Sequence, residues 1–159
     1  MNEIAKEIGM KRTNFASAHG MYVEENTSTA ADMAKLSMHA MKIQKFREIV
    51  KCQERETLSS CYPGHAYKWA NTNFLLKRDP NCTGIKTGIT WAAGPCLAAS
   101  IRKDGYNVCI IILSSCSPDS RWFEVPKLAY WGIKKYQKIK QSTLRPKIRR
   151  RIIKSFIYI

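Results

Sequence analysis

The segment Pro95-Cys-Leu-Ala-Ala-Ser-Ile-Arg-Lys-Asp-Gly-Tyr-Asn-Val-Cys-Ile-Ile-Ile-Leu113 decides the fold of this chain. Two apolar runs, Pro95–Arg102 and Tyr106–Leu113, flank Asp104-Gly105. An Asp-Gly pair between apolar runs is the strongest short-range signal of a β-hairpin. A two-residue turn at this pair places Lys103 opposite Tyr106 and sets the register of both strands.

Both faces of the predicted hairpin are apolar. In the predicted register one face carries Leu97, Ala99 and Ile101 beside Val108, Ile110 and Ile112, and the other carries Cys96, Ala98 and Ser100 beside Cys109, Ile111 and Leu113. A sheet with two apolar faces has to be covered on both sides. The sequence therefore predicts an antiparallel sheet with helices on each side.

Helices are predicted before and after this hairpin. Residues 1–50 are mainly helical: Thr29-x-x-Asp32 fits a capping box, and a short helix follows around Phe46–Val50. Pro118 is expected to open a last helix, which packs on the sheet through Trp122, Val125, Ala129 and Gly132. The remaining segments are predicted as a loop at Thr13–Val23, a turn at Cys61–His65, and an extended segment or short strand at Trp69–Leu76.

The length and composition are typical of a single domain, and they predict no metal site. The chain has 159 residues, 45% of them hydrophobic, and no apolar run approaches a membrane span of about 18 residues. The start, Met1–Glu7, is polar and has no apolar core, so no signal peptide is predicted. The six cysteines and three histidines show no metal-ligand spacing, and reduced thiols are favoured over disulfides.

The net charge of +15 is concentrated near the end of the chain. Lys134–Ile159 contains ten basic residues and no acidic one, which leaves +5 for residues 1–133. A solvated extension is the first interpretation of this basic tail, and binding to an anionic membrane surface is the second. Nucleic-acid binding is the least favoured, because no aromatic stacking platform or recognition fold accompanies the charge.

A Lys-Thr-Gly triplet lies on the strand-like segment before the hairpin, within Gly84-Ile-Lys-Thr-Gly-Ile-Thr-Trp-Ala-Ala-Gly94. On an edge strand such a triplet offers a backbone for a peptide to pair with, a cation and a hydroxyl for a carboxylate, and a glycine that leaves room for the ligand. It is one of the motifs of the serine penicillin-recognising enzymes. Because a triplet recurs by chance in many proteins, its meaning depends on the other motifs of the chain.

The wider pattern resembles the D-alanyl-D-alanine carboxypeptidases, which are low-molecular-mass penicillin-binding proteins. The agreement covers residues 1–133 and keeps the order of the family's motifs. The matching segments are Met1-Asn2, Ala5, Ile8-Gly9-Met10, Thr13, Phe15, His19-Gly20-Met21, Ser28–Ala34, Asn71–Leu76, Gly84–Thr90 and Ala93-Gly94.

This resemblance implies an α/β (α+β) fold of the β-lactamase/transpeptidase type, with an antiparallel sheet flanked by helices. It implies serine-type acyl transfer on peptidoglycan peptides that end in D-Ala-D-Ala, binding of β-lactams, no cofactor, and a location outside the inner membrane. Lys86, Thr87 and Gly88 correspond to the family's substrate-binding triplet. Arg121 corresponds to the arginine that holds the peptide's terminal carboxylate; the alternative is a solvated arginine at a helix start.

The family's nucleophile has no counterpart among the 159 residues. Ser-x-Asn does not occur, and Ser-x-x-Lys occurs once, as Ser100 to Lys103. On a strand these two side chains point to opposite faces, so this match is attributed to chance. We therefore expect that this chain has no catalytic residue, is inactive by itself, and has a fold that is incomplete at the N-terminus. The genomic sequence upstream of Met1 would show whether the two motifs precede it. The alternative function is a non-catalytic remnant or binding module that keeps the Lys-Thr-Gly cleft.

The resemblance also divides the chain. Residues 1–133 are expected to form a partial carboxypeptidase-like domain, with a helical part at 1–50 and the strand, hairpin and last helix at 82–133, and residues 134–159 form the basic tail. The family's sheet has five strands, two of which lie beside the last strand of the hairpin. Without them Tyr106–Leu113 becomes an exposed edge that favours an oligomer or a partner.

Overall fold

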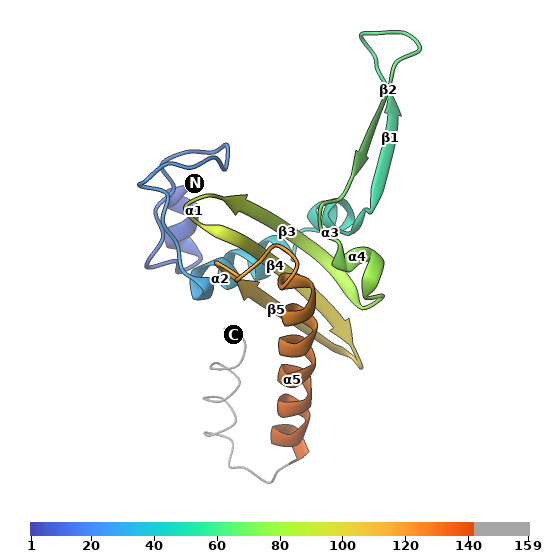
Figure 1. Ribbon diagram of the computed structural model, residues 1–159. Helices are drawn as coiled ribbons and strands as arrows, with labels where there is room; N and C mark the ends of the chain where they lie inside the picture. Colours follow the sequence, from blue (N-terminus) through green and yellow to red (C-terminus); the bar gives the residue numbers. More distant parts are fainter. Residues whose placement is uncertain (142–159) are drawn as a thin grey trace.

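The computed structural model describes residues 1–141 and has a three-stranded antiparallel sheet at its centre, in the order β3-β4-β5 (Figure 1). A separate two-stranded hairpin, β1-β2, extends away from this body. The elements in chain order are α1 (Asn2–Glu7), α2 (Ala30–Ala40), α3 (Gln44–Lys51), β1 (Glu54–Leu58), β2 (Ala66–Ala70), α4 (Leu75–Arg78), β3 (Cys82–Thr90), β4 (Gly94–Lys103), β5 (Tyr106–Ile112) and α5 (Arg121–Gln141).

The hairpin of β4 and β5 has the predicted register. Lys103 lies opposite Tyr106 and Leu97 opposite Ile112. Asp104 and Gly105 have φ angles of 52° and 77°, which is the left-handed pair that a type I′ turn requires. The turn chemistry therefore places each apolar residue on its expected face.

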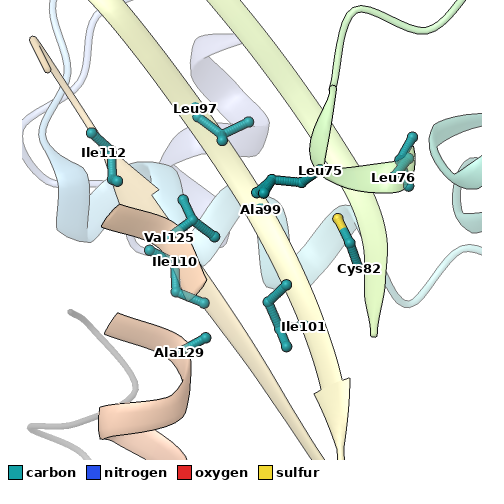
Figure 2. Close-up of a cluster of buried hydrophobic side chains, with 10 residues drawn as sticks. All are labelled: Leu75, Leu76, Cys82, Leu97, Ala99, Ile101, Ile110, Ile112, Val125 and Ala129. Carbon is teal, nitrogen blue, oxygen red and sulfur yellow. The ribbon is translucent and has the colours of Figure 1, made fainter. Parts of the chain in front are cut away.

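The main hydrophobic core lies between the sheet and helix α5 (Figure 2). Val125 and Ala129 of α5 are buried against one face of the hairpin, as predicted from their spacing. The helix begins at Arg121 rather than Pro118, because Ser117–Ser120 forms the turn that precedes it. The other buried members of this core come from α4, β3, β4 and β5, namely Leu75, Leu76, Cys82, Leu97, Ala99, Ile101, Ile110 and Ile112.

The opposite face of the sheet is covered by α2 and α3, so the prediction of helices on both sides is confirmed. Thr29 caps α2, and its side-chain oxygen accepts a hydrogen bond from the Asp32 backbone N–H at 3.2 Å. Helix α3 packs on β3 where Gly84 has a φ of +137°. A Cβ atom at Gly84 would lie 2.7 Å from Cγ2 of Val50, so this close approach requires glycine.

Buried Asp32 ties the N-terminal loop to α2. Its carboxylate accepts hydrogen bonds from the Arg12 backbone N–H at 2.7 Å and the Thr13 hydroxyl at 3.0 Å, and it pairs with Lys35 at 2.7 Å. Burial opposes ionisation, but these bonds, the one from Lys35 first, hold the pKa of Asp32 below its ordinary value. The carboxylate therefore stays charged and keeps the loop in place.

The β1-β2 hairpin was not predicted. Its two strands pair Glu54 with Ala70 through to Leu58 with Ala66, and all ten residues are exposed. The prediction of an extended segment or short strand at Trp69–Leu76 is correct for Trp69 and Ala70, which end β2. It is wrong for Leu75 and Leu76, where α4 begins after the Asn73 side chain accepts a hydrogen bond from the Leu75 N–H. The turn at Cys61–His65 is confirmed by the bond from the His65 N–H to the Tyr62 carbonyl at 3.1 Å.

The six cysteines are free thiols, in agreement with the preference for reduced cysteine. Burial raises the pKa of the Cys109 thiol on β5 to about 11, so this side chain stays protonated and acts as a small apolar residue. No helix within residues 1–141 is long and apolar enough to cross a membrane.

Helix α5 continues through residue 133 to Gln141, across the position at which the basic tail was predicted to start. Residues 142–159, which contain most of that tail, lie outside the described residues. The division at residue 133 stays a prediction.

Candidate functional site

Strand β3 places the Lys-Thr-Gly triplet at an edge of the sheet. It pairs with β4 on one side, with Lys86 opposite Ala98 and Gly88 opposite Cys96, and with no strand on its other side within residues 1–141. The side chain of Lys86 is on one face of β3 and that of Thr87 is on the other. This is the edge-strand setting that the sequence predicted for the triplet.

The backbone of Thr87 faces the free edge. In β4, alternate residues make the backbone hydrogen bonds to β5, and the residues between them make those to β3. The partners of these intervening residues on β3 are Gly84, Lys86 and Gly88, which therefore form the backbone hydrogen bonds to β4. The N–H and C=O groups of Thr87 therefore point outward. The ammonium group of Lys86 donates a hydrogen bond to this outward carbonyl oxygen of Thr87, which puts the cation beside the open backbone.

Space beside Gly88 is open. A Cβ atom built at this glycine meets no atom within 4 Å, and its φ is not in the left-handed region. Neither packing nor backbone conformation thus requires glycine at this position. The residue instead leaves the strand edge without a side chain next to Lys86 and Thr87, where a ligand can approach.

Thr72 is a neighbour of the triplet that sequence reasoning missed. Its hydroxyl oxygen lies 2.6 Å from the hydroxyl oxygen of Thr87. The preceding residue, Asn71, holds this segment by donating to the Cys52 carbonyl at 2.9 Å. Thr72 occupies a variable position inside the recognised Asn71–Leu76 segment, so only the pairing of two threonines in space identifies it.

Arg121 lies behind the triplet and is buried, with 3% of its surface exposed. Its Nη1 donates to the Cys96 carbonyl at 2.9 Å, and Cys96 is the residue opposite Gly88. Its Nε donates to the Pro118 carbonyl at 2.8 Å, and the guanidinium lies 4.7 Å from the Trp122 ring centre. The alternative of a solvated arginine is therefore wrong, and Arg121 adds fixed positive charge close to Gly88.

The single Ser-x-x-Lys match is not a nucleophile and base pair in this structure. Ser100 is buried, and its hydroxyl bonds to Thr83 at 2.9 Å and Asn107 at 3.0 Å. Lys103 extends to the other face of the sheet, where its ammonium lies 4.5 Å from the Tyr130 ring centre. The two groups are thus directed to opposite faces, in agreement with the argument from strand geometry.

The arrangement is suited to binding an extended peptide that ends in a carboxylate. Exposed Lys86 and the hydroxyls of Thr87 and Thr72 supply a cation and hydrogen-bond donors, the backbone of Thr87 can pair with a strand, and Arg121 contributes charge from behind. These are binding groups, and none of them is a serine activated by a base.

A family model described as D-alanyl-D-alanine carboxypeptidase matches residues 1–117. D-alanyl-D-alanine carboxypeptidase DacF of Bacillus subtilis is 32% identical over 141 residues, which are 86% of this chain and 35% of that protein. The D-alanyl-D-alanine carboxypeptidase of Streptomyces strain K15 is 30% identical over 135 residues, or 83% of this chain and 46% of that protein. The chain thus spans less than half the length of these relatives.

Solved structures agree with the sequence comparison. The crystal structure of the Streptomyces K15 DD-transpeptidase superposes with a TM-score of 0.79 at 29% identity, covering 84% of this chain and 52% of that one. DacD of Francisella tularensis, at 23% identity and a TM-score of 0.74, shares the fold. The β-lactamase/transpeptidase-like fold expected from the sequence is confirmed, and the chain belongs to the D-alanyl-D-alanine carboxypeptidase family.

Proposed function

We propose that this chain binds the end of a peptidoglycan stem peptide, D-Ala-D-Ala, or a β-lactam, along the free edge of β3. Lys86 and Thr87 bind the terminal carboxylate, Gly88 leaves room for the ligand backbone, and Arg121 stabilises the carboxylate from behind the strand. The observation that carries this proposal is the position of the Lys86 ammonium beside the outward-facing backbone of Thr87, at a point where Gly88 leaves the edge open.

The reaction that the family name describes is acyl transfer. A serine hydroxyl attacks the carbonyl between the two D-alanines, the terminal D-alanine leaves, and water releases the acyl group from the serine. The 159 residues contain no Ser-x-Asn, and Ser100 and Lys103 are directed to opposite faces. Our proposal for these 159 residues is therefore substrate binding alone.

The test is the affinity of the 159-residue chain for an N-acetylated peptide that ends in D-Ala-D-Ala, measured by calorimetry or NMR titration. Lys86→Ala removes a charge-assisted bond worth about 1.5–3 kcal/mol, so we expect about tenfold weaker binding or more, and Thr87→Val should weaken binding in the same direction. Lys51→Ala, which removes an exposed lysine at the end of α3, is the matched control. Equal binding of the L-Ala-L-Ala peptide, or no effect of Lys86→Ala, contradicts the proposal.

We further propose that the basic tail, residues 134–159, contacts an anionic membrane surface. Its ten basic residues would each contribute about 1 kcal/mol near a charged leaflet, and salt would weaken the contact. Removal of residues 142–159 should reduce binding to phosphatidylserine vesicles at least tenfold and leave the weak binding to neutral vesicles unchanged. Vesicle sedimentation at two salt concentrations measures this, and equal binding of the shortened chain would place the interaction on the folded body.

A further inference from the structure

The β1-β2 hairpin presents a row of exposed aromatic rings on one face. His65, Tyr67 and Trp69 alternate along the second strand and its approach, so their side chains lie on the same side. The rings of Tyr67 and Trp69 are stacked with centres 5.7 Å apart, and His65 meets Tyr67 edge-on at 4.8 Å. Trp69 is 52% exposed, although a ring of this size is usually covered.

A cleft of about 520 Å³ lies at the base of this hairpin, against α3. Trp69 and Ile49 form its apolar part. The polar part of the lining is formed by Lys45, Glu48, Gln53, Glu54, Arg55 and Asn71. Of these, Asn71 is already bonded to Cys52 and Asn73, and Glu54 is paired with Lys77 at 2.7 Å, so the lining offers a ligand chiefly the side chains of Lys45, Glu48 and Arg55. One flat aromatic ring surrounded by hydrogen-bonding groups suits a ligand with an apolar face and a polar rim.

The charge of the cleft limits the class of ligand. Its lining has two basic side chains, Lys45 and Arg55, and two acidic ones, Glu48 and Glu54, in a chain whose net charge is +15. A nucleic-acid surface would have more cations than anions, and this lining has equal numbers of the two. An uncharged ligand rich in hydroxyl and amide groups fits the balance of charges.

The cleft adjoins the Lys-Thr-Gly site. Asn71 lines the cleft, and the next residue, Thr72, is bonded through its hydroxyl to Thr87. Asn71 also joins β2 to the start of β1, because its N–H donates to the Gln53 carbonyl at 2.7 Å. A polymer whose peptide is bound at β3 would therefore lie next to the base of the β1-β2 hairpin, near Trp69 and then Tyr67.

We propose that this cleft is a saccharide-binding site in which a sugar ring stacks on Trp69, and that Tyr67 and His65 extend the platform to further sugars. The inference rests on the proposed function for its choice of polymer, since the chain that carries the stem peptide is a glycan of N-acetylated amino sugars. The acetamido and hydroxyl groups of such a sugar match the mixed donors and acceptors of the cleft.

The test uses peptide-free N-acetylglucosamine oligomers and the 159-residue chain in calorimetric or NMR titration. We expect saturable binding that Trp69→Ala weakens about tenfold or more and Trp69→Phe partly retains, because phenylalanine keeps the stacking face. Trp91→Ala is the matched control, since this tryptophan is 82% exposed and lies beyond the triplet at the end of β3. Tyr67→Ala should weaken the longer oligomers more than the disaccharide, and circular dichroism checks that each variant is folded.

Peptide binding at β3 and saccharide binding at the hairpin base can be contradicted independently of each other. Lys86→Ala should weaken binding of the D-Ala-D-Ala peptide and leave binding of the sugar oligomer unchanged. No saturable binding of the oligomers, equal affinity in folded Trp69→Ala, or displacement of the oligomers by a single-stranded oligonucleotide would overturn the saccharide site. Oligomer binding without peptide binding would support the saccharide site and contradict the proposed function.

Discussion

The 159-residue chain is expected to form no covalent adduct with a fluorescent penicillin. An adduct requires a serine hydroxyl that attacks the β-lactam carbonyl while a neighbouring base takes its proton. Ser100 is the single serine in a Ser-x-x-Lys sequence; it is buried, and its hydroxyl is held by Thr83 and Asn107. Lys103 lies over Tyr130 on the other side of the sheet and cannot act as its base.

The measurement is gel fluorescence after denaturation. We expect a signal at background for this chain. Non-covalent binding of the same penicillin should still be detected before denaturation, and Lys86→Ala should weaken it. A stable label that mass spectrometry assigns to any serine of this chain would show that a nucleophile is present and that our assignment of the site to binding alone is wrong.

The central hairpin could be predicted because its information is local. Asp104-Gly105 specifies a type I′ turn, and this turn sets the register of every pair from Lys103–Tyr106 to Leu97–Ile112. The alternation of apolar residues then identifies both faces. Helices with a cap and an apolar stripe, such as α2 behind Thr29, follow from similarly local signals.

The β1-β2 hairpin could not be predicted for the opposite reason. Its first strand is Glu-Arg-Glu-Thr-Leu, which has no apolar face, and both strands are exposed throughout. A cross-strand pair supports it, the contact of Lys68 with Glu56 at 3.8 Å, and the rings of Tyr67 and Trp69 also stack along β2. Glu56 and Lys68 lie far apart in sequence, and a search for periodicity along one segment does not detect such a pair.

The candidate site was predicted in part. The Lys-Thr-Gly triplet was found by its motif and its strand, and the structure places it at an edge. The burial of Arg121 and the contact of Thr72 with Thr87 depend on how α5 and the segment after β2 meet the sheet. These contacts are tertiary, so the sequence identifies the candidate residues but not their geometry.

The hydrogen-exchange rates of β5 are expected to alternate when the chain is dilute and to become uniformly slow when it is concentrated. In a two-residue hairpin Lys103 and Tyr106 form a hydrogen-bonded pair, so the N–H groups of Val108, Ile110 and Ile112 also bond to β4. Those of Asn107, Cys109 and Ile111 point to the outer edge. Within residues 1–141 no strand pairs with that edge.

This edge is a surface that favours association. It borders a groove of about 610 Å³ between α2 and α5, whose apolar lining includes Met38, Met41, Val108 and Leu128. An uncharged strand of high β-propensity beside such a groove recruits other chains. We therefore propose that the 159-residue chain associates through β5, either with a second copy or with a partner that supplies a strand.

The amide rates and the size of the particles test this proposal together. Light scattering should show association at high concentration, and the amides of Cys109 and Ile111 should then become as slow as those of Ile110 and Ile112. Ile111→Pro removes one outward N–H and should yield a monomer that keeps the bonds to β4. Ile110→Pro is the matched control; it removes an N–H bonded to β4 and should destabilise the fold.

A monodisperse monomer in which the amides of Cys109 and Ile111 are slow at every concentration would contradict association through β5. The outer edge would then be covered from within the chain. Because Lys140 near the end of α5 also lines the groove, residues 142–159 would be the segment to remove next. If their removal makes those two amides fast while Val108, Ile110 and Ile112 remain slow, the edge is closed by this chain's own tail and not by a second polypeptide.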